Sequence, residues 1–306
     1  MPFCLLLAAT FSCCAFAQET FLLTRNGKTT TENAARAQQR FAPCSTFKIP
    51  NSLIALETLA APDPYFVLEY EPKRDGEQYG AWSRNQDLRS AVRNSAAWYF
   101  REMARRIGAQ RMQDWLARFD YGNRAITPSV DRFWLGRDLA ISAVEQVRFL
   151  ERFQRGRLGV SARSAAAVKE MIRLETTPEY TWYGKTGSCR NAGGDWILWH
   201  VGFVERGAES ATYALNLSGP DYAGTAARRA KLVRQKLSGA GLIATEAPSA
   251  RAQMQARIDA AIKAFAGKVS VYAKNLDTGE EYAIDPDERV RTASTIKLPI
   301  MAAVFS

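Results

Sequence analysis

Residues 40–57 read RFAPCSTFKIPNSLIALE and contain the tetrapeptide STFK at Ser45–Lys48. The apolar spacing predicts a helix over Ser45–Leu59, with Pro50 close to its start, where a missing N–H is tolerated. On that helix the serine and the lysine lie one turn apart on the same face. A serine becomes a nucleophile when a neighbouring base takes its proton, and a lysine with a lowered pKa can do so. By itself the motif is weak, because S-x-x-K is common and is more often a helix start with a solvated lysine.

A second motif, Lys185-Thr186-Gly187, follows a predicted aromatic strand at Tyr180–Tyr183. A lysine and a threonine on an edge strand can bind a substrate carboxylate, and a glycine allows close approach of the backbone. S-x-x-K early and K-T-G late is the pattern of serine enzymes that recognise penicillins.

Those enzymes have a third motif between the two, and the chain offers two candidates. Ser83-Arg84-Asn85 fits an S-x-N motif but lies in an irregular polar stretch. Ser95-Ala96-Ala97 fits an S-x-V motif with alanine in the last position, and it opens a predicted helix over Ser95–Ile107. We favour Ser95, because a helix start holds the hydroxyl rigidly.

The order of predicted elements indicates an α+β fold, in which helices pack on an antiparallel sheet and form a helical subdomain. Thr20–Arg25 is expected to be an edge strand. The other expected strands are Tyr180–Tyr183, Trp196–Glu205 and Thr212–Leu217, and the other expected helices are Gln110–Phe119, Ser142–Phe153, Ser161–Leu174 and a basic amphipathic one over Ala223–Leu237.

Composition limits the classes of function. Of the 306 residues, 47% are hydrophobic and 24% are charged, which is typical of a globular protein. The net charge is +10, but the basic residues are scattered and not interleaved with aromatic ones, so we expect no nucleic-acid partner. His200 is the only histidine, which leaves no ligand set for zinc, and we expect no metal.

The first residues predict export. Phe3–Ala17 is apolar, too short to span a bilayer, and ends in Ala15-Phe16-Ala17. We therefore expect a signal peptide over 1–17 with cleavage near Ala17, a periplasmic or secreted protein, and no stable membrane insertion. Cleavage leaves Cys44 and Cys189 as the only cysteines, in an oxidising compartment.

From about residue 20 to 240 the sequence resembles the class D (oxacillinase-type) serine β-lactamases. The resemblance implies a β-lactamase/penicillin-binding-protein-like fold, a small-molecule β-lactam substrate and hydrolysis of the β-lactam ring. It rests on residues 40–57 and on five further motifs in the family's order: Ala81-Trp82, Asn94–Phe100, Phe119–Asn123, Phe133–Leu135 and Tyr183–Gly187.

The resemblance implies that Ser45 is acylated and that Lys48 reacts with carbon dioxide to give a carbamate (N6-carboxylysine), the general base. No cofactor is expected beyond carbon dioxide or bicarbonate. A carbamate requires a neutral amine in a dry pocket. The family's valine is Ala97 here, so we expect a larger pocket and a greater requirement for bicarbonate. The matching pocket residues are Phe47, Ala97, Phe100, Trp134 and Leu135.

The family's other roles transfer to matching positions. Ser95 relays a proton to the leaving nitrogen, and Lys185, Thr186 and Arg229 bind the substrate carboxylate. The backbone N–H groups of Ser45 and Ser188 form the oxyanion hole. The substrate side also includes Gly187, Trp82 at the rim and Tyr121. The family fold further implies a disulfide between Cys44 and Cys189.

Residues 251–306 resemble a different family, the N-terminal part of a class A β-lactamase. Lys268–Glu280 matches its first hairpin and Ser294-Thr-Ile-Lys297 its nucleophile motif. The remaining motifs of class A are absent, so we expect a truncated, non-catalytic segment. The expected organisation is a signal peptide (1–17), a class D domain (18–243), a linker (244–250) and this segment (251–306).

Two other functions share these motifs. The sensor domain of a β-lactam receptor binds the drug and stays acylated because its lysine loses the carbamate. A penicillin-binding transpeptidase is a third possibility, which Ser83-Arg84-Asn85 would support. The sequence predicts no oligomeric state.

Overall fold

The computed structural model describes residues 18–75, 80–126, 129–136, 138–274, 279 and 281–289. The predicted signal peptide and the Ser294–Lys297 motif lie outside the described residues. The chain divides into two compact units, Met1–Gln253 and Met254–Ser306. Among the described helices, none has the length and apolar character needed to cross a membrane.

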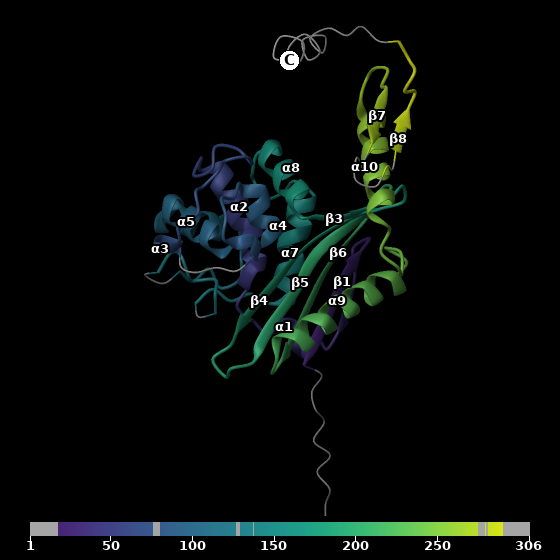
Figure 1. Cartoon of the computed structure of the whole chain (residues 1–306). Coiled ribbons are helices and arrows are strands. Elements are labelled where there is room, and N and C mark those ends of the chain that lie inside the picture. The colour runs from purple at the N-terminus through teal and green to yellow at the C-terminus, as the bar shows by residue number, and fades with distance from the viewer. Residues whose placement is uncertain are drawn as a thin grey trace, which may run out of the picture. The chain divides into compact units, whose positions relative to one another are not determined.

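A six-stranded antiparallel sheet forms the centre of the first unit, in the order β2-β1-β6-β5-β4-β3 (Figure 1). The prediction that Thr20–Arg25 is an edge strand is wrong, because a further strand pairs with its outer side. That strand is the exposed Lys28–Glu32, which follows a tight turn at Asn26-Gly27. The strands are β1 Glu19–Arg25, β2 Lys28–Glu32, β3 Arg173–Thr176, β4 Thr181–Arg190, β5 Trp196–Arg206 and β6 Glu209–Gly219.

Helices cover both faces of this sheet. The long helix α9 packs along one face, whereas α7 packs on the other, where the remaining helices gather (Figure 1). The helices are α1 Ala34–Gln38, α2 Lys48–Glu57, α3 Pro72–Asp75, α4 Leu88–Asn94, α5 Ala97–Ile107, α6 Ala109–Phe119, α7 Ala143–Gln154, α8 Ala162–Met171 and α9 Tyr222–Gly239, with short 3-10 helices η1 Cys44–Phe47 and η2 Gly80–Trp82.

Two helices differ from the predicted ranges. The helix expected over Ser45–Leu59 begins as the 3-10 turn η1 and becomes α-helical only at Lys48. The helix expected over Ser161–Leu174 ends at Met171, because Arg173–Thr176 pairs with β4 as a strand. In both cases, contacts with β4 decide where the α-helix begins or ends.

The two faces of the sheet explain the apolar run in β5, which reads WILWHVGFVER. Val201 and Phe203 belong to the core shared with the helical subdomain, whereas Leu198 and Val204 pack under α9 with Val233. A strand buried on both faces needs apolar residues at successive positions, unlike a strand with one solvated face.

The start of the predicted linker packs against the first unit, which itself extends to Gln253. Leu242 and Ile243 are buried in the α9 core. The N–H of Ala244 donates to the Tyr180 hydroxyl at 3.1 Å, and its carbonyl accepts from Arg234 at 2.9 Å. Ala244, the first residue assigned to the linker, is therefore fixed to the sheet.

The second unit contains most of helix α10 (Ala250–Ala264) and the antiparallel strands β7 (Val271–Lys274) and β8 (Glu281–Ile284). Within it, the Gln255 amide donates to the Tyr282 hydroxyl at 3.0 Å. The antiparallel pair agrees with the hairpin expected in this segment.

Candidate active site

Ser45 and Lys48 lie together where η1 joins α2. The Lys48 Nζ is 2.8 Å from the Ser45 Oγ. Lys48 is the first residue of α2, and only 1% of it is exposed. The S-x-x-K spacing thus produces the predicted contact even though Ser45 lies in a 3-10 turn.

The Lys48 amine lies near an aromatic ring, and two further aromatic side chains pack together in the core beside this helix start. Its Nζ lies 5.3 Å from the centre of the Phe100 ring on α5. Phe47 stacks on Trp134 with ring centres 5.3 Å apart, and all three aromatic residues are buried. Burial, and secondarily the charge of Lys185, lowers the pKa of Lys48 well below its ordinary value. The pocket therefore favours a neutral amine beside the serine.

Three further residues predicted for this pocket bear on the expected carbamate. The Trp134 indole Nε1 is buried and has no hydrogen-bond partner within the described structure. Leu135 follows it and is half-buried against the core. Ala97 is half-buried at the first position of α5, one turn before Phe100.

Ser95 lies opposite this pocket, in the turn between α4 and α5. Its φ of +58° makes it the C-cap of α4, so the expectation that Ser95 opens a helix is wrong. The Lys185 Nζ donates to the Ser95 Oγ at 3.0 Å and to the Thr186 carbonyl at 3.1 Å. The alternative Ser83 is exposed on the loop after η2 and does not line the active-site cavity.

The Lys185 side chain is also withdrawn from water, with 6% of the residue exposed. Burial, and then the nearby charge of Arg229, lowers its pKa to about 7. Lys185 is therefore protonated in part of the molecules at neutral pH, whereas burial favours the neutral form of Lys48.

Strand β4 has a free edge where the K-T-G motif lies. Its pairing with β3 reaches only to Tyr183, so Lys185–Arg190 pairs with β5 on one side and approaches η1 on the other. A Cβ on Gly187 would lie 2.8 Å from the Pro43 carbonyl oxygen, so only glycine fits this approach.

A disulfide crosses the same junction. Cys44 and Cys189 are bonded, with Cα atoms 5.7 Å apart, as predicted. These cysteines directly adjoin Ser45 and Ser188, so the bridge joins the chain segments that carry the two proposed oxyanion donors.

The segments enclose a cavity of about 300 Å³. Arg229 on α9 donates to the Gly187 carbonyl at 3.2 Å and to the Ser188 Oγ at 2.9 Å. Burial lowers the pKa of this arginine. The rim residue Trp82 is held by a bond from its Nε1 to the Asn94 carbonyl, at 2.6 Å. The cavity is lined by Ser45, Trp82, Ser95, Thr186, Ser188, Trp196, Tyr222 and Arg229.

Sequence reasoning missed two of these residues, Trp196 and Tyr222. Trp196 is the first residue of β5 and Tyr222 the first of α9, and their rings lie 4.9 Å apart. An aromatic residue at the start of each element is the only signal in the sequence, and it is no different from that of a core residue.

Tyr121 was predicted on the substrate side, but the structure does not bring it to the cavity. It is completely buried, with its ring 5.8 Å from Phe47 and 5.0 Å from Phe149. Its position behind Phe47 makes it part of the core that supports the Lys48 pocket.

The part of the chain that the structure describes contains no group of three or more His, Cys, Asp or Glu side chains placed to hold a metal. His200 is buried beside Tyr213, whose hydroxyl lies 2.9 Å from its Nδ1. Burial, and then the charges of Arg229 and Lys185, lowers its pKa to about 3.

Comparisons with known proteins agree with this geometry. Residues 17–237 match the penicillin-binding-protein transpeptidase domain family, and residues 253–306 match the β-lactamase enzyme family. The chain is 42% identical to β-lactamase OXA-5 of Pseudomonas aeruginosa over 190 residues, which are 61% of this chain and 70% of that protein. It is 39% identical to β-lactamase OXA-48 of Klebsiella pneumoniae over 201 residues, which are 65% of this chain and 74% of that protein.

Solved structures agree as well. A class D β-lactamase from Nostoc superposes with a TM-score of 0.70 and 34% identity, over 74% of this chain and 94% of that one. The class D enzyme FUS-1 from Fusobacterium nucleatum gives a TM-score of 0.70 and 30% identity, over 74% of this chain and 93% of that one. The chain therefore belongs to the class D serine β-lactamases.

Proposed function

We propose that the chain hydrolyses the β-lactam ring of penicillin-type antibiotics through an acyl-enzyme on Ser45, with carboxylated Lys48 as the general base. The contact of 2.8 Å between the Lys48 Nζ and the Ser45 Oγ, inside a buried aromatic pocket, carries this proposal. A neutral lysine in that position can take the serine proton, and a solvated lysine cannot.

Acylation uses groups that face the cavity. The Ser45 Oγ attacks the β-lactam carbonyl carbon and its proton passes to the Lys48 side chain. The C–N bond of the ring then breaks, and the nitrogen takes a proton from Ser95, which receives one in turn from Lys185 across their hydrogen bond. We assign the oxyanion hole to the backbone N–H groups of Ser45 and Ser188, beside the disulfide.

The cavity offers hydroxyl and positively charged groups to the substrate carboxylate. Thr186, Ser188 and Arg229 line the cavity. Lys185 lies next to Thr186 and carries a proton below about pH 7. A carboxylate bound here would leave the strained carbonyl carbon near Ser45, and water would then hydrolyse the ester to free the serine.

The pocket also fits the carboxylated form of Lys48. The buried Trp134 N–H has no acceptor within the described structure, and a carbamate oxygen would supply one. A carboxylated lysine offers a stronger anionic base beside Ser45 for both acylation and deacylation. Phe47, Phe100 and Trp134 exclude water around it.

Steady-state turnover of oxacillin and of a chromogenic cephalosporin by the full chain, with and without bicarbonate, tests the proposal. We expect sustained, bicarbonate-stimulated hydrolysis that Ser45→Ala abolishes and Ser83→Ala, on the exposed loop, leaves intact. A single burst of one acyl group per Ser45 would support the non-hydrolytic sensor. Loss of activity in Ser83→Ala would revive the transpeptidase-type S-x-N motif.

We also propose that residues 1–17 are a signal peptide, that the protein acts in the periplasm or outside the cell, and that residues 244–250 link the class D domain to a class A-like segment. The disulfide supports an oxidising compartment. The intact mass of the exported protein should correspond to a start at Gln18, and retention of residues 1–17 would contradict the proposal.

A further inference from the structure

The loop that carries Trp134 has an ionic attachment to helix α5. Residues 129–136 form neither helix nor strand, and turn bonds such as Leu135 N–H to the Arg132 carbonyl, at 2.9 Å, shape them. At one point the Trp134 carbonyl accepts from the Cys44 N–H at 3.1 Å, which ties the loop to η1. The side chain of Asp131 provides an attachment on another side.

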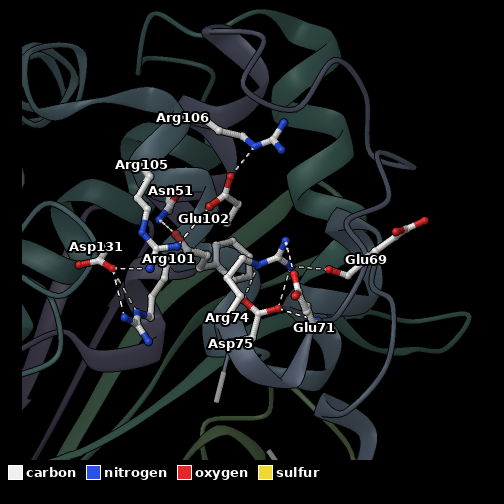
Figure 2. A network of polar contacts seen from close by, with 11 residues as sticks. Asn51, Glu69, Glu71, Arg74, Asp75, Arg101, Glu102, Arg105, Arg106 and Asp131 are labelled. Carbon is white, nitrogen blue, oxygen red and sulfur yellow. Dashed lines mark hydrogen bonds and ion pairs between the residues drawn. The ribbon is translucent and has the colours of Figure 1, made fainter. Parts of the chain in front are cut away.

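Asp131 binds two arginines of α5 with one carboxylate oxygen (Figure 2). Its Oδ2 accepts from Arg101 Nη2 at 3.2 Å and from Arg105 Nη2 at 2.7 Å. The Asp131 side chain is only 15% exposed. Burial would raise its pKa, but hydrogen bonds from Ser129 and Arg105 and the charges of both arginines outweigh burial and lower it.

Helix α5 also forms another wall of the Lys48 pocket. Phe100, whose ring faces the Lys48 amine, directly precedes Arg101. The Phe100 carbonyl in turn accepts from the Asn51 amide of α2 at 3.4 Å, a contact drawn in Figure 2. The Asp131 carboxylate therefore connects the wall that carries Trp134 to the wall that carries Phe100.

A second acid on α5 provides an internal comparison. Glu102 pairs with Arg105 at 3.1 Å and with Arg106 at 2.9 Å, one turn away on the same helix. These pairs share Arg105 with Asp131, and Glu102 is of similar exposure, at 22%. Glu102 differs from Asp131 in that its two pairs stay within α5.

We propose that Asp131 is a positioning residue, which holds the Trp134 loop against α5 so that Lys48 stays carboxylated. This inference rests on the proposed function. Without the ionic attachment, the loop is held by its turn bonds, by the Cys44 bond to η1 and by aromatic packing, and the Trp134 N–H spends less time where it can bind a carbamate oxygen. Because the attachment lies outside the pocket, its loss weakens carboxylation without removing a group that touches the lysine or the substrate.

Asp131→Asn in the full chain tests the proposal, with Glu102→Gln as the matched control. Two readouts are needed: the bicarbonate concentration for half-maximal turnover, and the ¹³C NMR carbamate signal after addition of ¹³C-bicarbonate. We expect Asp131→Asn to need about three- to tenfold more bicarbonate, the range expected for losing two partly exposed ion pairs, and to give a weaker signal at equal bicarbonate. Saturating bicarbonate should restore most of its turnover, and Glu102→Gln should behave like the parent.

Three outcomes would overturn the proposal. Equal bicarbonate dependence in Asp131→Asn and Glu102→Gln would show that the attachment is only structural. A turnover loss in Asp131→Asn that bicarbonate does not reverse would do the same. Absence of both the carbamate signal and bicarbonate stimulation in the parent chain would overturn the carboxylated base itself, and with it this inference.

A second variant covers the case in which Asp131→Asn does not fold. Arg101→Gln removes one arm of the attachment and leaves Arg105 in place. We expect a smaller shift in the same direction, and an unchanged bicarbonate requirement in folded Arg101→Gln would overturn the proposal.

Discussion

Two buried lysines contact serines that line the same cavity, and their surroundings give them different chemistry. Lys48 lies at the start of a helix with its amine near the ring of Phe100 and in contact with Ser45. Lys185 lies on a strand, and its amine contacts the Ser95 hydroxyl and a backbone carbonyl. Both have lowered pKa values, but that of Lys48 is well below the ordinary value and that of Lys185 is about 7.

The difference shows how one cleft can hold a base and an acid of the same residue type. An aromatic pocket disfavours the ammonium form and leaves a neutral amine, which can accept a proton or react with carbon dioxide. The amine of Lys185 contacts two acceptors, and its pKa of about 7 leaves part of it as ammonium, which can attract a carboxylate and support proton transfer by Ser95. The proposed mechanism therefore depends on keeping the two surroundings distinct.

Removing a single hydrogen-bond donor near Lys48 should impair the general base without impairing substrate binding. Trp134→Phe keeps an aromatic ring beside Phe47 but deletes the indole N–H. A hydrogen bond to a charged group contributes about 1.5–3 kcal/mol, so kcat at ambient bicarbonate should fall roughly 10- to 100-fold. KM, which depends on binding of the substrate carboxylate near Lys185, should change little.

Steady-state kinetics with oxacillin would measure both parameters. Trp115→Phe, at a half-buried site on α6, is the matched control and should retain activity. If Trp134→Phe kept the kcat of the parent, the indole N–H would have no role in the mechanism.

The Lys185 side should set the alkaline limb of the pH profile. With a pKa of about 7, Lys185 loses its proton as pH rises, so the attraction for the substrate carboxylate weakens. We expect kcat/KM to fall about tenfold between pH 7 and 9, with Arg229 limiting the loss, because kcat/KM reports groups of the free enzyme. The acidic limb of the same profile should come from Lys48, because its base form is lost as pH falls.

Lys185→Arg keeps a positive charge across this range and should flatten the alkaline limb, even if the absolute rate drops. The measurement is kcat/KM of the parent and of Lys185→Arg from pH 5 to 9.5, and the shapes of the two profiles are compared. An alkaline limb that persists unchanged in Lys185→Arg would assign it to another group.

The smallest expected effect concerns the volume of the Lys48 pocket. Ala97→Val adds two methyl groups one turn before Phe100 and should exclude water from the carbamate. Each fully buried methylene contributes about 0.8 kcal/mol, and because this position is only half-buried, the two methyl groups together should contribute about that amount. The bicarbonate concentration for half-maximal activity should therefore fall roughly fourfold. Ala109→Val, at the corresponding exposed first position of α6, should leave it unchanged. An unaltered requirement in Ala97→Val would mean that this position does not limit carboxylation.

Local sequence was sufficient for the parts of the site that depend on short-range geometry. The contact between Ser45 and Lys48 follows from a spacing of three residues, which a 3-10 turn and an α-helix both place on one side. The family resemblance gave the fold, the K-T-G strand and the Cys44–Cys189 bridge. The helix predicted over Ser161–Leu174 was too long, because its helical periodicity continues into β3. Pairing of β3 with β4 ends the helix.

Long-range packing decided the rest. Ser95 was favoured over Ser83 as the start of a helix, but it caps the end of α4 instead. Only the fold brings it to Lys185, which is 90 residues away. Tyr121 belongs to a motif with the functional residues but packs behind Phe47, whereas Trp196 and Tyr222 belong to no motif and line the cavity.

The sequence by itself determined the nucleophile, its lysine and the family of the fold, because these depend on residue type and spacing along the chain. Only the tertiary structure decided that Lys48 is buried away from water and that the Lys185 amine has hydrogen-bond acceptors. It also decided that Asp131 connects the loop of Trp134 to helix α5. The physical reason is that a pKa depends on burial and on neighbouring charges, which come from residues distant in the sequence.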